Sequence, residues 1–142
     1  MAGMDIFSVA VSGMRAASVR LDVSASNVAN MLTTGRLPAA DGTSAAPAAY
    51  APLRVDQVEV AGGATAATVS TASPSYTPGY DPSAPYADGN GMVAVPNVDL
   101  VNEAIAQITA EYAFKASAVM LRTASEMTQT LLDSIAPSRP AA

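Results

Sequence analysis

Hydrophobic residues recur at helical spacing in the last third of the chain, from Pro96 to Ile135. They follow one another at steps of three and four residues, which places their side chains on one stripe of an α-helix. The stripe reads Val101, Ile105, Ile108, Tyr112, Ala116, Met120, Ala124, Met127, Leu131 and Ile135. At a rise of about 1.5 Å per residue the helix would be about 55 Å long, so a second long helix is needed to cover the stripe.

A matching segment lies at the N-terminus, from about Asp5 to Met31. Asp5 is a candidate cap for its first turn, Gly13 would allow close approach of a partner helix, and Gly35 marks its end. Its seam also follows steps of three and four and comprises Phe7, Ala10, Met14, Ala17, Leu21, Ser24, Val28 and Met31. Such a seam is typical of a helix that packs on another helix, either inside its own domain or on other chains.

The region between the two helical segments predicts a loop followed by short strands. Residues 36–52 are rich in Ala, Ser, Gly and Pro and show no period. Prolines between residues 74 and 85 argue against a central strand there, and Asp88-Gly89-Asn90-Gly91 predicts a turn. The predicted strands are Leu53 to Val60, Thr65 to Thr71 and Met92 to Val95, with a turn at Gly62-Gly63.

These patterns predict a mainly α fold with a small β insert. Two long terminal helices pack as a coiled-coil-like hairpin and are joined by a loop and a short irregular β region. We expect an N-terminal assembly helix in residues 1–35, the loop and β insert in 36–95, a C-terminal assembly helix in 96–136 and a tail in 137–142. Asn97 and Asp99 are the two candidate N-caps of the C-terminal helix.

Composition limits how stable this fold can be alone and what it can bind. Hydrophobic residues make up 50% of the chain, but many are alanine and only 5% of residues are aromatic, so the core is small. A net charge of −5 without a basic cluster argues against nucleic acid as a partner. The N-terminus has no basic region before an apolar run, and no run approaches a membrane span, so we expect neither a cleaved signal peptide nor a transmembrane helix.

Candidate catalytic and metal-binding chemistry finds no support in the residues present. The chain has no Cys and no His, which excludes thiolate and imidazole chemistry. The turn at residues 88–91 resembles the start of a calcium loop, but Met92 and Val93 occupy positions that would need an oxygen ligand and a glycine. Lys115 is explained by a helical ion pair with Glu111. We therefore predict a protein that is not an enzyme and has no catalytic residue, cofactor, metal or small-molecule substrate.

Two segments together resemble a known family. Residues 12–30 contain Ser12-Gly13-Met14, Arg20-Leu21 and Ser26-Asn27-Val28-Ala29-Asn30. This pattern resembles the N-terminal signature of the flagellar axial (rod and hook) proteins. Residues 80–103 contain Tyr80-Asp81-Pro82, Gly91-Met92-Val93 and Pro96-Asn97-Val98-Asp99, and resemble the short proximal-rod members of that family. The first loop departs from the pattern because it lacks a tyrosine after Gly35.

The resemblance implies a structural subunit of the bacterial flagellar basal-body rod, the periplasmic shaft that transmits torque from motor to hook. It implies export by the flagellar type III system, and as partners copies of the chain itself, other rod subunits, the basal-body ring and the export apparatus. The alternative is a small secreted or soluble helical-hairpin binding module or adaptor, which would fold cooperatively as an isolated monomer. The expected assembly interface, within one subunit or between neighbours, comprises Phe7, Met14, Leu21, Val28, Ile105, Ile108, Tyr112, Met120, Met127 and Leu131.

Overall fold

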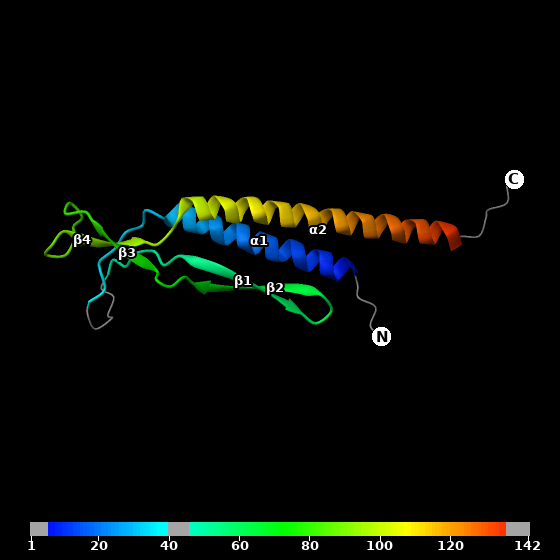
Figure 1. Ribbon diagram of the computed structural model, residues 1–142, viewed down its shortest axis with the longest axis horizontal. Helices are drawn as coiled ribbons and strands as arrows, with labels where there is room; N and C mark the ends of the chain where they lie inside the picture. Colours follow the sequence, from blue (N-terminus) through cyan, green and yellow to red (C-terminus); the bar gives the residue numbers. More distant parts are fainter. Residues whose placement is uncertain (1–5, 40–45, 136–142) are drawn as a thin grey trace.

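Two long helices lie side by side in the computed structural model, which describes residues 6–39 and 46–135 (Figure 1). Helix α1 spans Ile6–Asn30 and helix α2 spans Leu100–Ile135. Two separate two-stranded antiparallel sheets complete the fold. This arrangement confirms the predicted mainly α fold with a small β insert. The expected cap Asp5 and the expected tail at residues 137–142 lie outside the described residues.

The two helices run antiparallel, and α2 is much the longer. The Ser24 hydroxyl donates a hydrogen bond to the carbonyl oxygen of Glu103 (3.1 Å), near the end of α1 and the start of α2. Further along the pair, Gly13 faces Ser117. This register brings the start of α1 to the level of Ala124, the last buried residue of α2. Residues 125–135 are all exposed and extend past the start of the described part of α1, by about 16 Å at helical rise (Figure 1).

The start of α2 is fixed by Asp99. Its Oδ1 accepts hydrogen bonds from the backbone N–H groups of Val101 (2.8 Å) and Asn102 (3.2 Å), which have no partner inside the helix. Asn97, the other candidate cap, instead donates its side-chain amide to the carbonyl oxygen of Pro74 (3.0 Å). Asp99 is therefore the N-cap, and its negative charge also favours the positive end of the helix.

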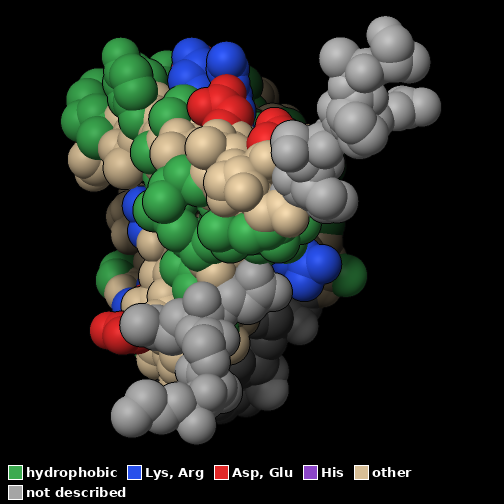
Figure 2. All heavy atoms as spheres, turned by 90° about the vertical axis from the view of Figure 1, so that its right-hand side faces the viewer, with side chains coloured by type: hydrophobic (Ala, Val, Ile, Leu, Met, Phe, Trp, Pro, Cys, Tyr) green, Lys and Arg blue, Asp and Glu red, His purple; other side chains and the backbone are tan. Residues whose placement is uncertain are grey.

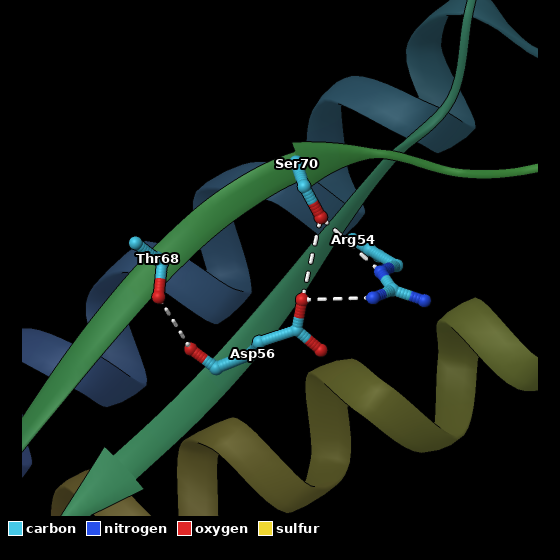
Figure 3. Close-up of polar contacts among 4 residues, drawn as sticks. All are labelled: Arg54, Asp56, Thr68 and Ser70. Carbon is cyan, nitrogen blue, oxygen red and sulfur yellow. Dashed lines mark hydrogen bonds and ion pairs between the residues drawn. The ribbon is translucent and has the colours of Figure 1, made fainter.

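Strands β1 (Leu53–Val60) and β2 (Ala64–Thr71) form a hairpin that lies along α1 (Figure 1). Its turn uses Gly62 and Gly63 at φ 90° and 76°, a left-handed conformation that glycine adopts without strain. On the exposed face of the hairpin, Arg54 and Asp56 of β1 meet Thr68 and Ser70 of β2 (Figure 3). Cross-strand contacts of this kind help to hold the register of a two-stranded sheet.

Strands β3 (Tyr76–Tyr80) and β4 (Met92–Pro96) lie at the end of the molecule where α1 ends and α2 begins (Figure 1). With only two strands, β3 is an edge strand, so it accommodates Pro78, as predicted. The turn before β4 is also confirmed, because Asp88 Oδ1 accepts the N–H groups of Asn90 and Met92, both at 2.8 Å. A two-way backbone bridge between Gly35 and Ala94 (3.0 and 2.8 Å) ties β4 to the segment that follows α1.

Candidate assembly interface

The surface by which α1 and α2 contact each other is built from small residues. Ala10, Ala17 and Ser24 recur at every seventh position of α1, and each is at most 2% exposed. Ala110 and Ala124 occupy matching positions of α2, with 1% and 4% exposure. This spacing is that of a coiled-coil-like pair, which confirms the predicted hairpin.

Gly13 of α1 and Ser117 of α2 lie in close contact across the helix pair. A Cβ atom added at Gly13 would lie 2.6 Å from Ser117 Oγ, closer than real contacts allow. The predicted role of Gly13 in close approach is therefore confirmed. Close approach of two backbones leaves no room for large side chains between them, so the large apolar residues of both helices lie at the flanks or on the outside.

Asn27 ties three parts of the chain together near the end of α1. It is 2% exposed, and its Nδ2 donates to Glu103 Oε1 of α2 (2.7 Å) and to the carbonyl oxygen of Leu53 in β1 (2.8 Å). Its Oδ1 accepts from the Leu53 N–H and from the Tyr50 hydroxyl, both at 2.9 Å. All four hydrogen bonds of the amide are thus satisfied, which is how a buried polar group avoids a desolvation cost. We call this set of contacts the Asn27 clamp.

Five large apolar residues between Val101 and Val119 of α2 are exposed on the side away from α1, and of these Ile105 also borders a hollow lined by Val23 and Ser24 of α1. The outer stripe, as we call this set, is between 54% and 68% exposed and comprises Val101, Ile105, Ile108, Tyr112 and Val119. Large exposed apolar side chains gathered along one helix are typical of interaction sites. Ile105, Ile108 and Tyr112 belong to the predicted interface, whereas Val119 and the neighbouring Phe114 were not predicted.

The predicted stripe of α2 does not stay on one face of the helix. Nine steps cover the 34 positions from Val101 to Ile135, an average of about 3.8 residues, whereas one helical turn takes 3.6. The stripe therefore winds around the helix. It starts opposite α1, reaches the α1 side at the buried Ala124, and continues on the extension through Met127 and Leu131, which are 67% and 62% exposed. The expectation of one continuous stripe facing the first helix is wrong.

The remaining predicted interface residues lie on the flanks of the helix pair. Leu21 and Met120 are 43% and 45% exposed, while Phe7, Met14 and Val28 are half-buried. A view along the helices onto the free end of α2 shows hydrophobic side chains over much of the upper half of the molecule, with charged side chains at the top and others at both sides lower down (Figure 2). The structure of one chain thus leaves most of the predicted interface accessible to other molecules.

Charged groups on α2 form local pairs. Lys115 pairs with Glu111, and Arg122 pairs with Glu126 at 2.8 Å, each one helical turn apart and exposed. Within residues 6–39 and 46–135, no cluster of acidic side chains could hold a metal ion. In the same ranges, no helix is both long enough and apolar enough to cross a membrane.

The two helices pack through small residues and expose large apolar residues on their outer sides. This arrangement is typical of one class of protein, the subunits of larger assemblies, which bury their helices against other molecules. Comparison with known proteins agrees. The family model described as "Flagella basal body rod protein" matches residues 7–35, which hold α1. The model described as "Flagellar basal body rod FlgEFG protein C-terminal" matches residues 90–134, which hold β4 and nearly all of α2.

Curated relatives extend the similarity over almost the whole chain. The flagellar basal-body rod protein FlgC of Salmonella typhimurium is 34% identical over 136 residues, covering 89% of this chain and 93% of the relative. The FlgC protein of Escherichia coli O6:H1 is 36% identical with the same coverage. That of Agrobacterium fabrum is 27% identical and covers 92% of this chain and 94% of its own. The chain belongs to the FlgC family of flagellar basal-body rod proteins.

Proposed function

We propose that this chain is a structural subunit of the flagellar basal-body rod and transmits torque from the motor to the hook. The observation that carries the proposal is the outer stripe, five large apolar side chains on α2 that are more than half exposed. Because the chain belongs to a family of flagellar rod proteins, the rod is the assembly in which these five side chains would be buried. The role is mechanical, because densely packed helices resist deformation, and it requires no catalytic group.

The location and partners belong to the same proposal. The subunit resides in the periplasmic part of the basal body, after export by the flagellar type III system. It packs on copies of itself and on other rod subunits, and it contacts the basal-body ring and the export apparatus on its way to or within the rod. The interface comprises the outer stripe, the extension of α2 beyond Ala124, and the flank of α1 that carries Met14 and Leu21.

The test is complementation of a strain that lacks its rod subunit of this family. Leu21→Asp and Ile108→Asp each place a charge on the proposed interface, where burial without a partner is costly. Ala61→Asp is the matched control, because Ala61 is exposed in the turn between β1 and β2 and lies outside both helices. We expect the parent chain and the control to restore rods and swimming, and both interface variants to restore neither.

Misfolding must be separated from failed assembly. Leu21 and Ile108 are 43% and 54% exposed in the free chain, so both variants should keep the circular dichroism spectrum of the parent. Normal swimming of both interface variants would refute the proposal. Failure of the parent chain itself to restore swimming would do the same.

A further inference from the structure

The outer stripe has a complementary surface on the same chain. On the side of the helix pair away from the β1–β2 hairpin, two adjoining hollows of about 220 and 570 Å³ share Ser18 and Phe114. We call them together the seam groove, and its apolar walls are formed by Val11, Met14, Leu21, Phe114 and Leu121. The groove exists because the seam between the helices is made of small residues, which leaves a valley at its edge.

The seam groove and the outer stripe lie on different faces. Ser12 accepts a hydrogen bond from Thr65 of the hairpin (3.1 Å), and Leu21 follows nine residues later, two and a half helical turns, so it points to the opposite side of α1. The outer stripe faces a third direction, away from α1 across α2. A contact between stripe and groove therefore joins two different surfaces, and such a head-to-tail contact generates either a closed ring or an open helical array.

We propose that the outer stripe of one copy of this chain docks in the seam groove of a second copy, with the incoming α2 parallel to the receiving α1. This rests on the proposed rod function, because a rod needs an open, repeating contact. A contact of stripe with stripe would instead close as a two-fold dimer and leave the groove uncovered. A second copy suffices as occupant because each chain carries both surfaces.

The two surfaces match in length. The α1 wall of the groove runs from Val11 to Leu21, and the central part of the stripe runs from Ile108 to Val119. Each of these segments is about 15 to 17 Å long at helical rise. A row of large side chains that enters a groove between two helices is the packing by which a third helix joins a helix pair.

The order of charged residues along α1 and α2 determines the direction in which the incoming helix docks. Arg15 lines the groove, and Asp22 follows it seven residues later on the same side of α1. Both are exposed, and neither has an ion pair among the described residues. On α2, Glu111 and then Lys115 lie between the outer stripe and the seam groove, so they line the groove of the receiving chain and also flank the stripe of the incoming helix. When that helix runs parallel to α1, helical geometry turns this charged side toward the rim. Arg15 then meets Glu111 and Asp22 meets Lys115, opposite in sign at both positions, which favours this orientation.

The absence of cysteine from the chain allows a direct test. Tyr112→Cys places a cysteine on the outer stripe, and Ser18→Cys places one in the seam groove. In the control pair, Thr68→Cys on the exposed face of the hairpin takes the place of Tyr112→Cys. Cells that express two single-cysteine variants together, and that swim, are treated with a short bismaleimide, which cross-links neighbouring cysteines. We expect a cross-linked dimer from stripe plus groove, several-fold more abundant than from control plus groove or from either single variant alone.

Charge reversal then tests the orientation. Arg15→Glu, introduced into the groove chain, should lower the dimer yield several-fold, and Glu111→Arg in the stripe chain should restore it. Stripe–stripe cross-linking as strong as stripe–groove cross-linking would overturn the proposal, as would a yield no higher than the control. Because the cells swim, either of these two results would refute the stripe–groove contact without refuting the proposed rod function. If Tyr112→Cys blocks swimming, Val119→Cys with Leu21→Cys probes the same contact, and the same two outcomes decide it.

Discussion

Replacing Asn27 with aspartate tests the Asn27 clamp by changing one atom. Asp is close to Asn in shape, but it replaces the Nδ2 donor with an acceptor oxygen. That oxygen would face Glu103 Oε1 and the carbonyl oxygen of Leu53 at the present 2.7 and 2.8 Å. Two hydrogen bonds are lost, one of them to a charged group, and two carboxylates are brought together in a half-buried site.

The expected loss at pH 7 is about 3 kcal/mol in the free energy of unfolding. A hydrogen bond to a charged group contributes about 1.5–3 kcal/mol, and a buried acceptor left without a donor costs about 1–3 kcal/mol. Two adjacent carboxylates raise the pKa of one of them above its value in the unfolded chain. The folded variant therefore binds a proton that the unfolded chain does not, so its stability rises as pH falls through that raised pKa.

The measurement is urea unfolding followed by circular dichroism, at pH 7 and at pH 4.5. A fixed concentration of trimethylamine oxide in all samples strengthens burial and provides a folded baseline for a chain with a small core. Asn90→Asp is the matched control, because Asn90 is exposed in a turn and should change stability by less than about 0.5 kcal/mol. An Asn27→Asp loss equal to the control, or one that is the same at both pH values, would refute the clamp.

Three further substitutions test the helix pair and the surface, each by thermal unfolding. Gly13→Ala alone should stabilise little or destabilise, because its Cβ would lie 2.6 Å from Ser117 Oγ. Gly13→Ala together with Ser117→Ala should gain up to about 1 kcal/mol from helix propensity, because the two Cβ atoms would be 3.5 Å apart. Additive effects of the two substitutions would contradict this close contact. Gly35→Ala should strongly destabilise because its Cβ would collide with the backbone of residues 47–49. Gly89→Ala, with no atom within 4 Å, should be neutral, and equal effects would contradict the close packing of Gly35 on that loop. Lys115→Ala should cost less than about 0.5 kcal/mol, and high salt should abolish the difference from the parent, since its ion pair is exposed.

Local features of the fold could be predicted from the sequence because local physics determines them. Both helices follow from apolar residues at steps of three and four, and the start of α2 follows from a capping Asp before the first turn. The turn at Asp88 follows from its side chain bonding to the backbone two and four residues later. Each of these interactions joins residues within one or two turns of chain.

The face of α1 that meets α2 could be predicted, because the predicted seam contains the buried Ala10, Ala17 and Ser24. The face of α2 could not be predicted in the same way. Hydrophobic spacing ranks large apolar residues above alanine, so on α2 it chose the exposed Ile105 and Ile108 and missed the buried Ala110, and Ala124 is the one member of the predicted stripe that is buried. The signal that identifies the seam is the heptad spacing of small residues around Gly13. The Asn27 clamp joins positions up to 76 residues apart in sequence, and periodicity carries no information about such pairs.

The small seam also determines how the subunit depends on its assembly. Apolar burial stabilises in proportion to area, and alanine side chains provide little of it, so the helix pair alone contributes modest stability. The large side chains that could contribute more, such as Ile108 and Tyr112, are 54% and 68% exposed until another molecule covers them. Binding of the folded state by a neighbour stabilises that state by mass action. A subunit of this kind should therefore gain much of its stability on joining the assembly, and it should stay easy to unfold before it does.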